Sequence, residues 1–222
     1  LATGVLLVGC DTGEPPNHYS AVEVAPDPVV PAQSNVNTSV PILTVANNLE
    51  VVEGVAPTLV WSDEFNGDAL DPNRWLFETG DGSEYGIPGW GNNELQYYLP
   101  DNAQLEDGLL KIEARKQSIG RFDYTSARIN TRDRFAFRYG RIEASIRLPA
   151  GRGLLPAFWL LGQDESLYGI WPALGEIDIV EAYSLGVFGK NSVIGTIHYG
   201  TSFPDDYRSE TASYLVPTDA TA

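Results

Sequence analysis

Short runs of alternating apolar and polar residues follow one another along the chain from residue 57 onward. In 110–115 and in 141–148, every second side chain is apolar and those between are polar or charged. Successive side chains of a strand point to opposite faces, so both runs predict strands with one buried face. The run 156–161 is apolar throughout and predicts a central strand that is covered on both sides.

Turn-forming pairs such as Asn66-Gly67 and Asp107-Gly108 separate these runs. No long stretch has the apolar spacing of about 3.6 residues that an amphipathic helix requires. Many short strands joined by turns are typical of two packed antiparallel sheets. The pattern therefore predicts an all-β fold, an antiparallel β-sandwich, for residues 57–222.

The stretch 175–181 reads Gly-Glu-Ile-Asp-Ile-Val-Glu and combines strand-forming residues with three carboxylates. On a strand, Glu176 and Asp178 share one face, but strict alternation turns Glu181 toward the apolar face. An unpaired carboxylate in a core is very costly. We therefore expect a one-residue β-bulge near Val180, which returns Glu181 to the face of the other two acids.

Three carboxyl groups on one face fit the needs of retaining glycoside hydrolysis. In this reaction one carboxylate attacks the anomeric carbon, and a second, about 5–5.5 Å away, protonates the leaving oxygen and later activates water. Crowded negative charge raises the pKa of one carboxyl group and keeps it protonated as the acid. The plainer alternative is an acidic, solvated face of an edge strand. The residues alone also leave open which of the two glutamates is the nucleophile.

The stretch resembles the catalytic motif of glycoside hydrolase family 16 in its bulged, laminarinase-like form, with Val180 where methionine is usual. Five further segments are similar to the same family and occur in the same order: 61–67, 90–98, 139–141, 156–159 and 196–200. The resemblance implies a concanavalin A-like β-jelly roll whose concave sheet forms the glycan cleft. Family domains continue for several strands beyond a segment like 196–200. We therefore expect 57–222 to be an incomplete catalytic domain that lacks its C-terminal strands.

By this resemblance, Glu176 is the nucleophile, Glu181 is the acid/base and Asp178 tunes the ionisation of Glu176. The implied function is endo-acting, retaining hydrolysis of β-1,3-glucan such as laminarin, with mixed β-1,3/1,4-glucan as a further substrate. Two alternatives stay open. One is action on another neutral or algal polysaccharide, by hydrolysis or transglycosylation, and the other is non-catalytic binding of β-glucan. The intact set of three acids speaks against the binding protein, since binding proteins of this fold commonly lose these residues.

Candidate substrate-binding residues surround the three acids. Trp171 lies five residues before the first glutamate of the motif. It offers a flat face to a sugar ring, whose C–H groups pack on aromatic surfaces. The resemblance places Asn92 and Arg128 along the cleft, where amide and guanidinium groups bond to sugar hydroxyls, and directs His198 toward the acid/base. Each of these residues has a plainer alternative in the core or on the surface. The full set of candidates is Trp171, Asn92, Arg128, His198, Trp90 and Trp159.

The formal net charge of −16 narrows the range of partners. This charge argues against binding of nucleic acid, because nucleic-acid affinity comes from Lys and Arg side chains that contact phosphates. Long-range repulsion also disfavours a polyanionic substrate. A neutral polysaccharide is compatible with the charge. We expect a monomer with no nucleic-acid partner, and we expect catalysis to require no cofactor. Many family members carry a structural calcium ion, and Glu64 matches one ligand position. Calcium needs about six to eight oxygen ligands, so this residue would require partners.

The first 56 residues differ in composition from the rest. Residues 1–10 are apolar and end in Leu-Val-Gly-Cys, which resembles a bacterial lipobox with Cys10 as the lipidated residue. Residues 11–56 hold six prolines and no basic residue, and predict a disordered linker. These features predict an exported bacterial protein, lipid-anchored at the cell envelope or extracellular, whose only membrane contact is the lipid. The alternative for 1–10 is a buried apolar strand with an incidental thiol. Because methionine is absent, we expect the true start to lie upstream.

Overall fold

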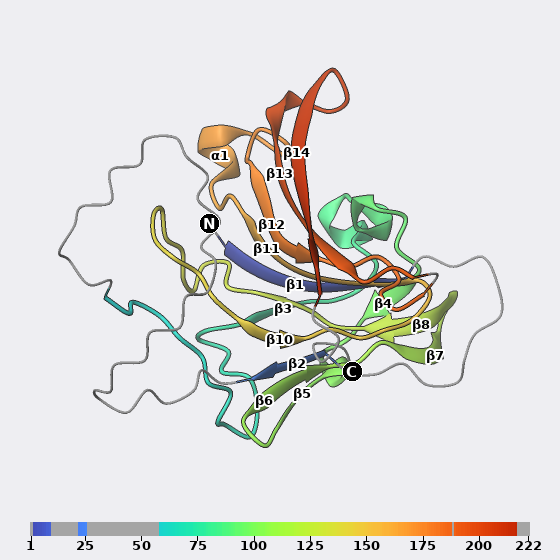
Figure 1. Ribbon diagram of the computed structural model, residues 1–222. Helices are drawn as coiled ribbons and strands as arrows, with labels where there is room; N and C mark the ends of the chain where they lie inside the picture. The colour runs from blue at the N-terminus through green and yellow to red at the C-terminus, as the bar shows by residue number, and fades with distance from the viewer. Residues whose placement is uncertain (1, 10–21, 26–57, 188, 217–222) are drawn as a thin grey trace.

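The computed structural model describes residues 2–9, 22–25, 58–187 and 189–216, which are mostly strand (Figure 1). The described helices are short: α1 (Glu165–Tyr168) and the 3-10 helices η1 (Ser83–Tyr85), η2 (Pro88–Gly91) and η3 (Pro100–Asn102). The strands are β1 (Ala2–Gly9), β2 (Val22–Ala25), β3 (Leu76–Glu78), β4 (Gln96–Tyr98), β5 (Ala103–Glu106), β6 (Leu109–Ile112), β7 (Arg115–Ile119), β8 (Phe122–Ser126), β9 (Arg128–Asn130), β10 (Ser145–Arg147), β11 (Leu154–Leu161), β12 (Glu176–Glu181), β13 (Ser192–Ser202) and β14 (Asp206–Leu215).

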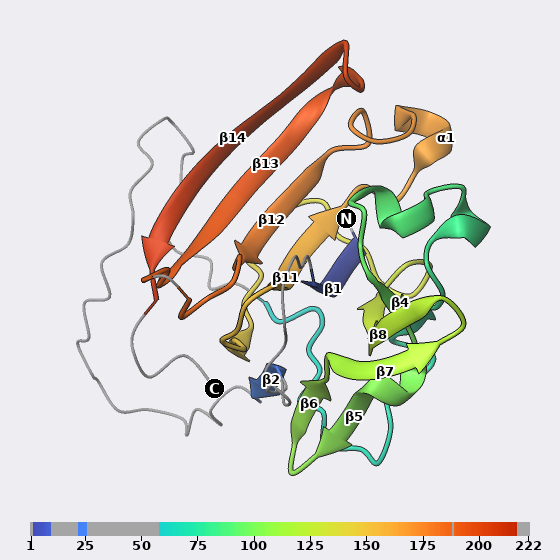
Figure 2. The ribbon, with the colours of Figure 1, turned by 90° about the vertical axis from the view of Figure 1, so that its right-hand side faces the viewer.

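The described strands form three sheets. The largest has seven strands in the order β14-β13-β12-β11-β1-β9-β3, and the smaller sheets have the orders β10-β2-β6-β5 and β4-β8-β7. Every pair in these sheets is antiparallel except β4 with β8. Figure 2 shows β14, β13, β12 and β11 side by side in the large sheet. The all-β prediction is confirmed, and the alternating runs 110–115 and 141–148 overlap β6 and β10.

The main core lies between the seven-stranded and the four-stranded sheet. Leu110 and Ile112 on β6 belong to one buried cluster with Ile129 on β9 and Phe158 on β11. Trp75, from the segment before β3, is buried in the same cluster. Because both sheets contribute side chains, they pack face to face, and the fold is a β-sandwich stabilised by the burial of this apolar surface.

Strand β11 is apolar on both faces, as its sequence predicts. Phe158 points into the core between the two sheets, whereas its neighbours Ala157 and Trp159 pack with Trp90 and Tyr98 in a second buried cluster. Consecutive residues of a strand face opposite sides of the sheet, so this second cluster lies on the side away from the main core. The prediction of a central strand covered on both sides is confirmed.

The described part of the N-terminal region pairs with the sandwich. Strand β1 lies between β11 and β9 and pairs Val5 with both Phe158 and Ile129, while β2 lies between β10 and β6. The predicted lipidation residue Cys10 lies outside the described residues, and so does the predicted linker 11–56 except for β2. Within the part of the chain that is described, no helix is long and apolar enough to cross a membrane.

Candidate active site

Strand β12 contains the predicted bulge. Against β11, Val180 and Asp178 pair with the consecutive residues Phe158 and Trp159, so one residue of β12 between them has no counterpart. Against β13, the register shifts between Asp178 and Glu181. The extra residue turns Glu181 to the face that the other two acids share. The predicted bulge, and with it the gathering of three carboxyl groups on one face, is confirmed.

The loop between β11 and β12 carries Trp171 to the first of these acids. It closes through a hydrogen bond of 3.2 Å from the Gly162 N–H to the Gly175 carbonyl oxygen. A Cβ atom at Gly162 would lie 2.2 Å from the carbonyl oxygen of Leu174, so this close return requires glycine. The loop thereby places the indole N–H of Trp171 2.6 Å from Oε2 of Glu176, to which it donates a hydrogen bond.

A line of hydrogen bonds runs across the strands on this face. Glu176 and Asp178 share a side-chain hydrogen bond. His198, which is the register partner of Glu176 on β13, has its Nε2 2.8 Å from Oδ2 of Asp178. The Nδ1 of the same imidazole lies 2.7 Å from the hydroxyl of Tyr207 on β14. The line therefore connects Trp171, Glu176, Asp178, His198 and Tyr207.

An aromatic group flanks one end of this line. The Trp171 ring centroid lies 5.3 Å from that of Tyr207, 5.4 Å from that of Phe203 and 6.1 Å from that of His198. Trp171 and Tyr207 are half-buried, and Phe203 is 61% exposed. Aromatic surface therefore lies beside the carboxyl groups and is partly open to solvent. Stacking of a sugar on Trp171 stays a prediction, to which the structure adds the bond from its N–H to Glu176.

All three carboxyl groups have raised pKa values. Burial raises the pKa of Glu176 to about 7 and the negative charge of Asp178 adds to this rise, while His198 and the Trp171 N–H oppose it. Burial, followed by the charge of Glu181, raises the pKa of Asp178 to about 7. Burial, followed by the charge of Glu176, raises the pKa of Glu181. The group therefore retains protons at pH values where exposed carboxyl groups have lost them.

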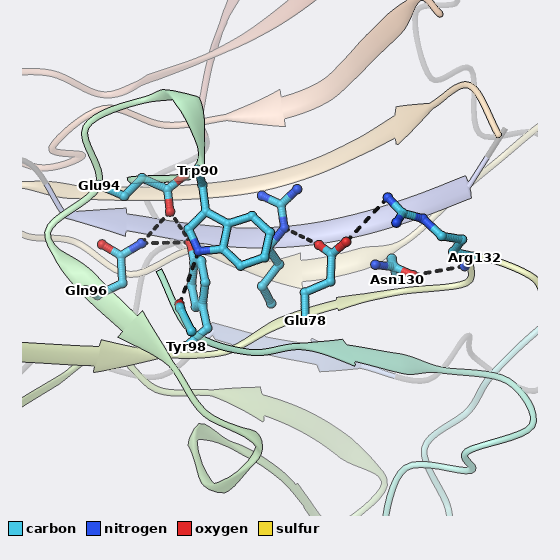
Figure 3. Close-up of polar contacts among 9 residues, drawn as sticks. Glu78, Trp90, Glu94, Gln96, Tyr98, Asn130 and Arg132 are labelled. Atoms are coloured by element: carbon cyan, nitrogen blue, oxygen red, sulfur yellow. Dashed lines mark hydrogen bonds and ion pairs between the residues drawn. The ribbon is translucent and has the colours of Figure 1, made fainter. Parts of the chain in front are cut away.

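A second polar group centres on Arg128 of β9, and Figure 3 labels its members Glu78, Trp90 and Arg132. Arg128 lies opposite Glu78 on β3, and the two form a buried ion pair that Arg132 extends at 3.5 Å from Glu78. The guanidinium carbon of Arg128 lies 4.5 Å from the ring centroid of Trp90 and 4.9 Å from that of Trp159. Cation–π contacts of this kind, together with the ion pair, hold the guanidinium in place.

Glu94 is a further buried carboxyl group beside this arginine (Figure 3). Its Oε2 accepts hydrogen bonds from Nε2 of Gln96 at 2.8 Å and from the hydroxyl of Tyr98 at 2.7 Å. Burial raises the pKa of Glu94 to about 7, although the bond from Tyr98 and the positive charge of Arg128 favour its ionised form. Glu94 therefore titrates in the neutral range.

The predicted binding residues fall into two groups. Trp171 and His198 contact the acids directly, whereas Arg128, Trp90 and Trp159 lie together around the guanidinium. Only 5% of Trp90 and 8% of Trp159 are exposed, so other side chains cover most of both rings. Both tryptophans are therefore packed side chains in this structure, and stacking of a sugar on them stays a prediction.

Asn92 directly follows the short helix that contains Trp90. It is exposed at the C-terminal end of η2, and its side chain bonds to Glu94. The exposed amide is accessible to a ligand, and its contact with Glu94 connects it to the buried polar group of Figure 3. Its predicted role in binding sugar hydroxyls is compatible with this position and stays a prediction.

Several residues of the site were not predicted from the sequence, among them Tyr207, Glu78 and Glu94. Tyr207 lies beyond the last segment of family resemblance, and no pattern around it distinguishes it from a surface residue. Glu78 ends a strand of three residues, which is too short for a burial pattern to develop. Glu94 does carry a signal, because it stands in the resembling segment 90–98 among aromatic residues, where a carboxyl group is unusual.

The calcium expectation receives no support from the acidic residues. Among the described residues, no three side chains of His, Cys, Asp or Glu are grouped so that they could hold a metal ion. Glu64 is described and belongs to no such group. Calcium also takes backbone carbonyl and water oxygens, so the structural calcium ion at Glu64 stays a prediction.

Comparison with known proteins gives matches along most of the chain. A family model described as "Beta-glucan synthesis-associated protein SKN1/KRE6/Sbg1" matches residues 29–173. Glucan endo-1,3-beta-glucosidase A1 of Niallia circulans is 42% identical over 159 residues, which are 66% of this chain and 22% of that protein.

Solved structures show the same relationship. The laminarinase catalytic domain of Thermotoga maritima is 44% identical with a TM-score of 0.65, and the match covers 72% of this chain and 63% of that domain. A LamA variant from Zobellia galactanivorans, in complex with laminaritriose and laminaritetraose, is 34% identical with a TM-score of 0.61. This match covers 73% of the present chain and 69% of that one. The chain belongs to the family that the matched model describes and, with these relatives, to the laminarinase-like members of glycoside hydrolase family 16.

Proposed function

We propose that the chain carries the catalytic residues of an endo-acting, retaining hydrolase of β-1,3-glucan, built on a concanavalin A-like β-jelly roll. The observation that carries this proposal is the bulge that gathers Glu176, Asp178 and Glu181 on one face of β12. The plainer alternative, a solvated acidic face on an edge strand, does not describe β12, which lies between β11 and β13. The names of the laminarinases and of the endo-1,3-beta-glucosidase support β-1,3-glucan as the substrate class.

In the first step, the ionised carboxylate of Glu176 attacks the anomeric carbon. The proton of the Glu181 carboxyl group passes to the glycosidic oxygen while the bond from that oxygen to the anomeric carbon breaks. The products are an ester between Glu176 and the sugar and a free hydroxyl on the departing chain. The raised pKa of Glu181 favours the protonated form that this transfer requires.

In the second step, Glu181 is ionised and removes a proton from a water molecule. The water oxygen attacks the anomeric carbon, and the ester bond to Glu176 breaks. Because each step inverts the configuration at the anomeric carbon, the product keeps the β configuration of the substrate. Glu181 regains its proton and Glu176 regains its charge, so the site returns to its starting state.

The neighbouring side chains adjust the charge of Glu176 during this cycle. Its carboxylate accepts the hydrogen bond from Trp171, which favours the ionised form that the attack requires. Asp178 lies between Glu176 and His198 and bonds to both, so it can hold a proton when Glu176 is ionised. A proton shared in this way limits the charge repulsion among three adjacent carboxyl groups.

The substrate class follows from the charge and the polar groups of the chain. With a net charge of −16, the protein repels polyanions, whereas the uncharged hydroxyls of a β-glucan can bond to exposed amides such as that of Asn92. The complex of the LamA variant with laminari-oligosaccharides supports this class. Mixed β-1,3/1,4-glucan is the second substrate that we propose, with cleavage at its β-1,3 linkages.

Release of reducing sugar from laminarin, lichenan and agarose tests the proposal. We expect activity on laminarin, and less or none on agarose, with the β-anomer as the first product in a proton NMR time course. Glu176→Gln and Glu181→Gln each remove a chemical participant and should lower the rate by several orders of magnitude. Binding of laminarin without any hydrolysis would instead favour the β-glucan-binding protein, and an α-anomer formed first would exclude the double displacement.

We also propose that the mature protein is exported and anchored through a lipid on Cys10. The lipobox-like sequence Leu-Val-Gly-Cys supports this proposal. Because one acyl chain alone binds a membrane weakly, stable anchoring needs more than one chain. Processing at this site would remove β1, which pairs with β9 and β11 in the structure. Mass spectrometry of the N-terminal peptide from the native cell decides between a lipidated Cys10 and a retained β1.

A further inference from the structure

Tyr207 is the one residue of the hydrogen-bonded line that has no role in the cycle above. Its hydroxyl lies 2.7 Å from Nδ1 of His198, and the two rings stack with centroids 5.8 Å apart and an interplanar angle of 21°. Trp171 and Phe203 flank the phenol with centroids at 5.3 and 5.5 Å. The phenol is therefore held by rings on several sides, and both its ring and its hydroxyl contact the imidazole.

The other nitrogen of the imidazole faces a carboxyl group. Nε2 of His198 lies 2.8 Å from Oδ2 of Asp178, and the Asp178 side chain is 5% exposed. A neutral imidazole has one N–H donor and one acceptor nitrogen, and an ionised carboxylate can only accept. Oδ2 of Asp178 accepts when Asp178 is ionised, and also when Asp178 directs its own proton toward Glu176. In both cases the N–H of a neutral imidazole must be on Nε2, and Nδ1 must then accept a hydrogen bond. The hydroxyl of Tyr207 is the donor in place to supply it.

We propose that Tyr207 is a positioning residue that holds the imidazole of His198 so that its Nε2–H donates to Asp178. In this arrangement the hydroxyl proton of Tyr207 bonds to Nδ1, and the Nε2–H bonds to Oδ2 of Asp178. Asp178 is then fixed between the imidazole and Glu176. The effect on catalysis rests on the proposed function, whereas the placement of the proton on His198 can be measured without any activity.

Removing the hydroxyl should loosen this arrangement without removing the ring. In Tyr207→Phe the stacked ring is kept, but Nδ1 loses its donor, and the imidazole can rotate or move its proton to Nδ1. If the proton moves to Nδ1, Nε2 becomes an acceptor, and Asp178 can bond to it only when protonated. Asp178 would then direct its proton to His198 instead of toward Glu176, and the nucleophile would lose a partner.

Nuclear magnetic resonance of the full chain with ¹⁵N-labelled histidine tests the proton placement. The sequence holds two histidines, His18 and His198, so a His18→Gln variant assigns the signals. For the wild type at pH 7 we expect His198 to be protonated on Nε2 alone, with a slowly exchanging Nε2–H. In Tyr207→Phe we expect that N–H signal to broaden with exchange or to move to Nδ1. Tyr199→Phe, which removes an exposed hydroxyl that bonds to Glu210, is the control and should leave the signals unchanged.

A double-mutant cycle tests whether Tyr207 acts through His198. Tyr207→Phe alone should lower kcat/KM on laminarin about fivefold, the size of one neutral hydrogen bond. In a His198→Gln background the same change should have no further effect, because the group through which it acts is gone. A wild-type His198 protonated on Nδ1 or on both nitrogens would overturn the proposal, and so would an unchanged spectrum in Tyr207→Phe or full additivity in the cycle. If no variant or wild-type chain hydrolyses laminarin, the proposed function fails while the spectra still decide the role of Tyr207.

Discussion

The indole N–H of Trp171 donates a hydrogen bond to Oε2 of Glu176 across 2.6 Å. The sequence predicted this tryptophan as a flat surface for a sugar ring, but the structure shows its polar edge in contact with the proposed nucleophile. A hydrogen bond to a charged group contributes about 1.5–3 kcal/mol, which is enough to change a reaction rate tenfold or more. Trp171 therefore has two separable properties, a donor and an aromatic face.

Replacing Trp171 with phenylalanine separates these properties, because Phe keeps an aromatic face and has no donor. We expect Trp171→Phe to lower kcat/KM by about 10- to 100-fold. Since the N–H favours the ionised form of Glu176, its loss raises the pKa of Glu176 further above about 7. The acidic limb of the pH profile of kcat/KM should therefore move to higher pH.

Trp171→Ala provides the comparison, since it removes both the donor and the aromatic face. If the ring also stacks on sugar, Trp171→Ala should show a further loss, mainly as a higher KM. Equal activity of Trp171→Phe and the wild type, with an unshifted acidic limb, would contradict a role for the hydrogen bond. Denaturation curves of both variants serve as the check that the fold is intact.

The buried carboxyl group of Glu94 should make stability depend on pH. The pKa of Glu94 is raised from 4.5 to about 7 in the folded chain, so the native state binds more protons than the unfolded state between these values. The free energy of unfolding therefore falls as pH rises through this window. Glu94→Gln removes the ionisation, and its stability relative to the wild type should rise by on the order of 1 kcal/mol between pH 5 and pH 8.5.

Urea denaturation of Glu94→Gln and the wild type at both pH values measures this difference. Glu84→Gln is the matched control, because Glu84 is exposed in η1 and the same change there should show no pH-dependent gain. A stability difference between Glu94→Gln and the wild type that stays constant with pH would mean that Glu94 does not titrate in the neutral range.

The ion pair between Glu78 and Arg128 gives a prediction about stability. Both residues are buried, and Arg128 also contacts two indole rings. Removing one partner of a buried pair leaves an uncompensated charge and costs about 3–5 kcal/mol. We expect Glu78→Ala to lose stability on this scale. Glu106→Ala, which breaks an exposed pair with Lys111, should change it little. Equal effects of the two substitutions on the urea midpoint would show that the buried pair stabilises the fold no more than the exposed pair.

The sequence predicted the features of this site that follow from strand periodicity. The position of Glu181 conflicts with strict alternation, and that conflict alone predicted the bulge that the register of β12 confirms. The alternating runs likewise predicted strands β6 and β10, since one-sided burial imposes a period of two. These predictions depend on neighbours in the chain, which the sequence displays directly.

The contacts that were missed depend on chain segments that are distant or irregular. The bond from Trp171 to Glu176 requires the tight return of a loop at Gly162, and no periodicity describes such a path. Tyr207 reaches His198 only because β14 pairs with β13 as the outermost strand of the large sheet. Trp159 lies against Arg128 because β11 and β9 belong to one sheet, whereas η2 carries Trp90 to the same guanidinium. Sequence alone could not separate this packing from sugar binding.

The roles of the two glutamates can be separated with azide and a dinitrophenyl β-glycoside of a short β-1,3-glucan. The good leaving group needs no acid, so Glu181→Ala should still form the ester on Glu176, and hydrolysis of that ester becomes slow. Azide needs no general base and should attack the ester, which accelerates turnover by at least about tenfold and gives the β-azide.

Glu176→Ala should behave differently, because no ester can form when the nucleophile is absent. Azide can then enter the vacated space and attack the substrate directly, and this single displacement gives the α-azide. Glu84→Ala, at an exposed position, should match the wild type and give no glycosyl azide. Carbon and proton NMR of the two azides identifies the anomers. If Glu181→Ala gives the α-azide and Glu176→Ala the β-azide, the two glutamates exchange roles, and the bond from Trp171 supports the acid/base instead of the nucleophile.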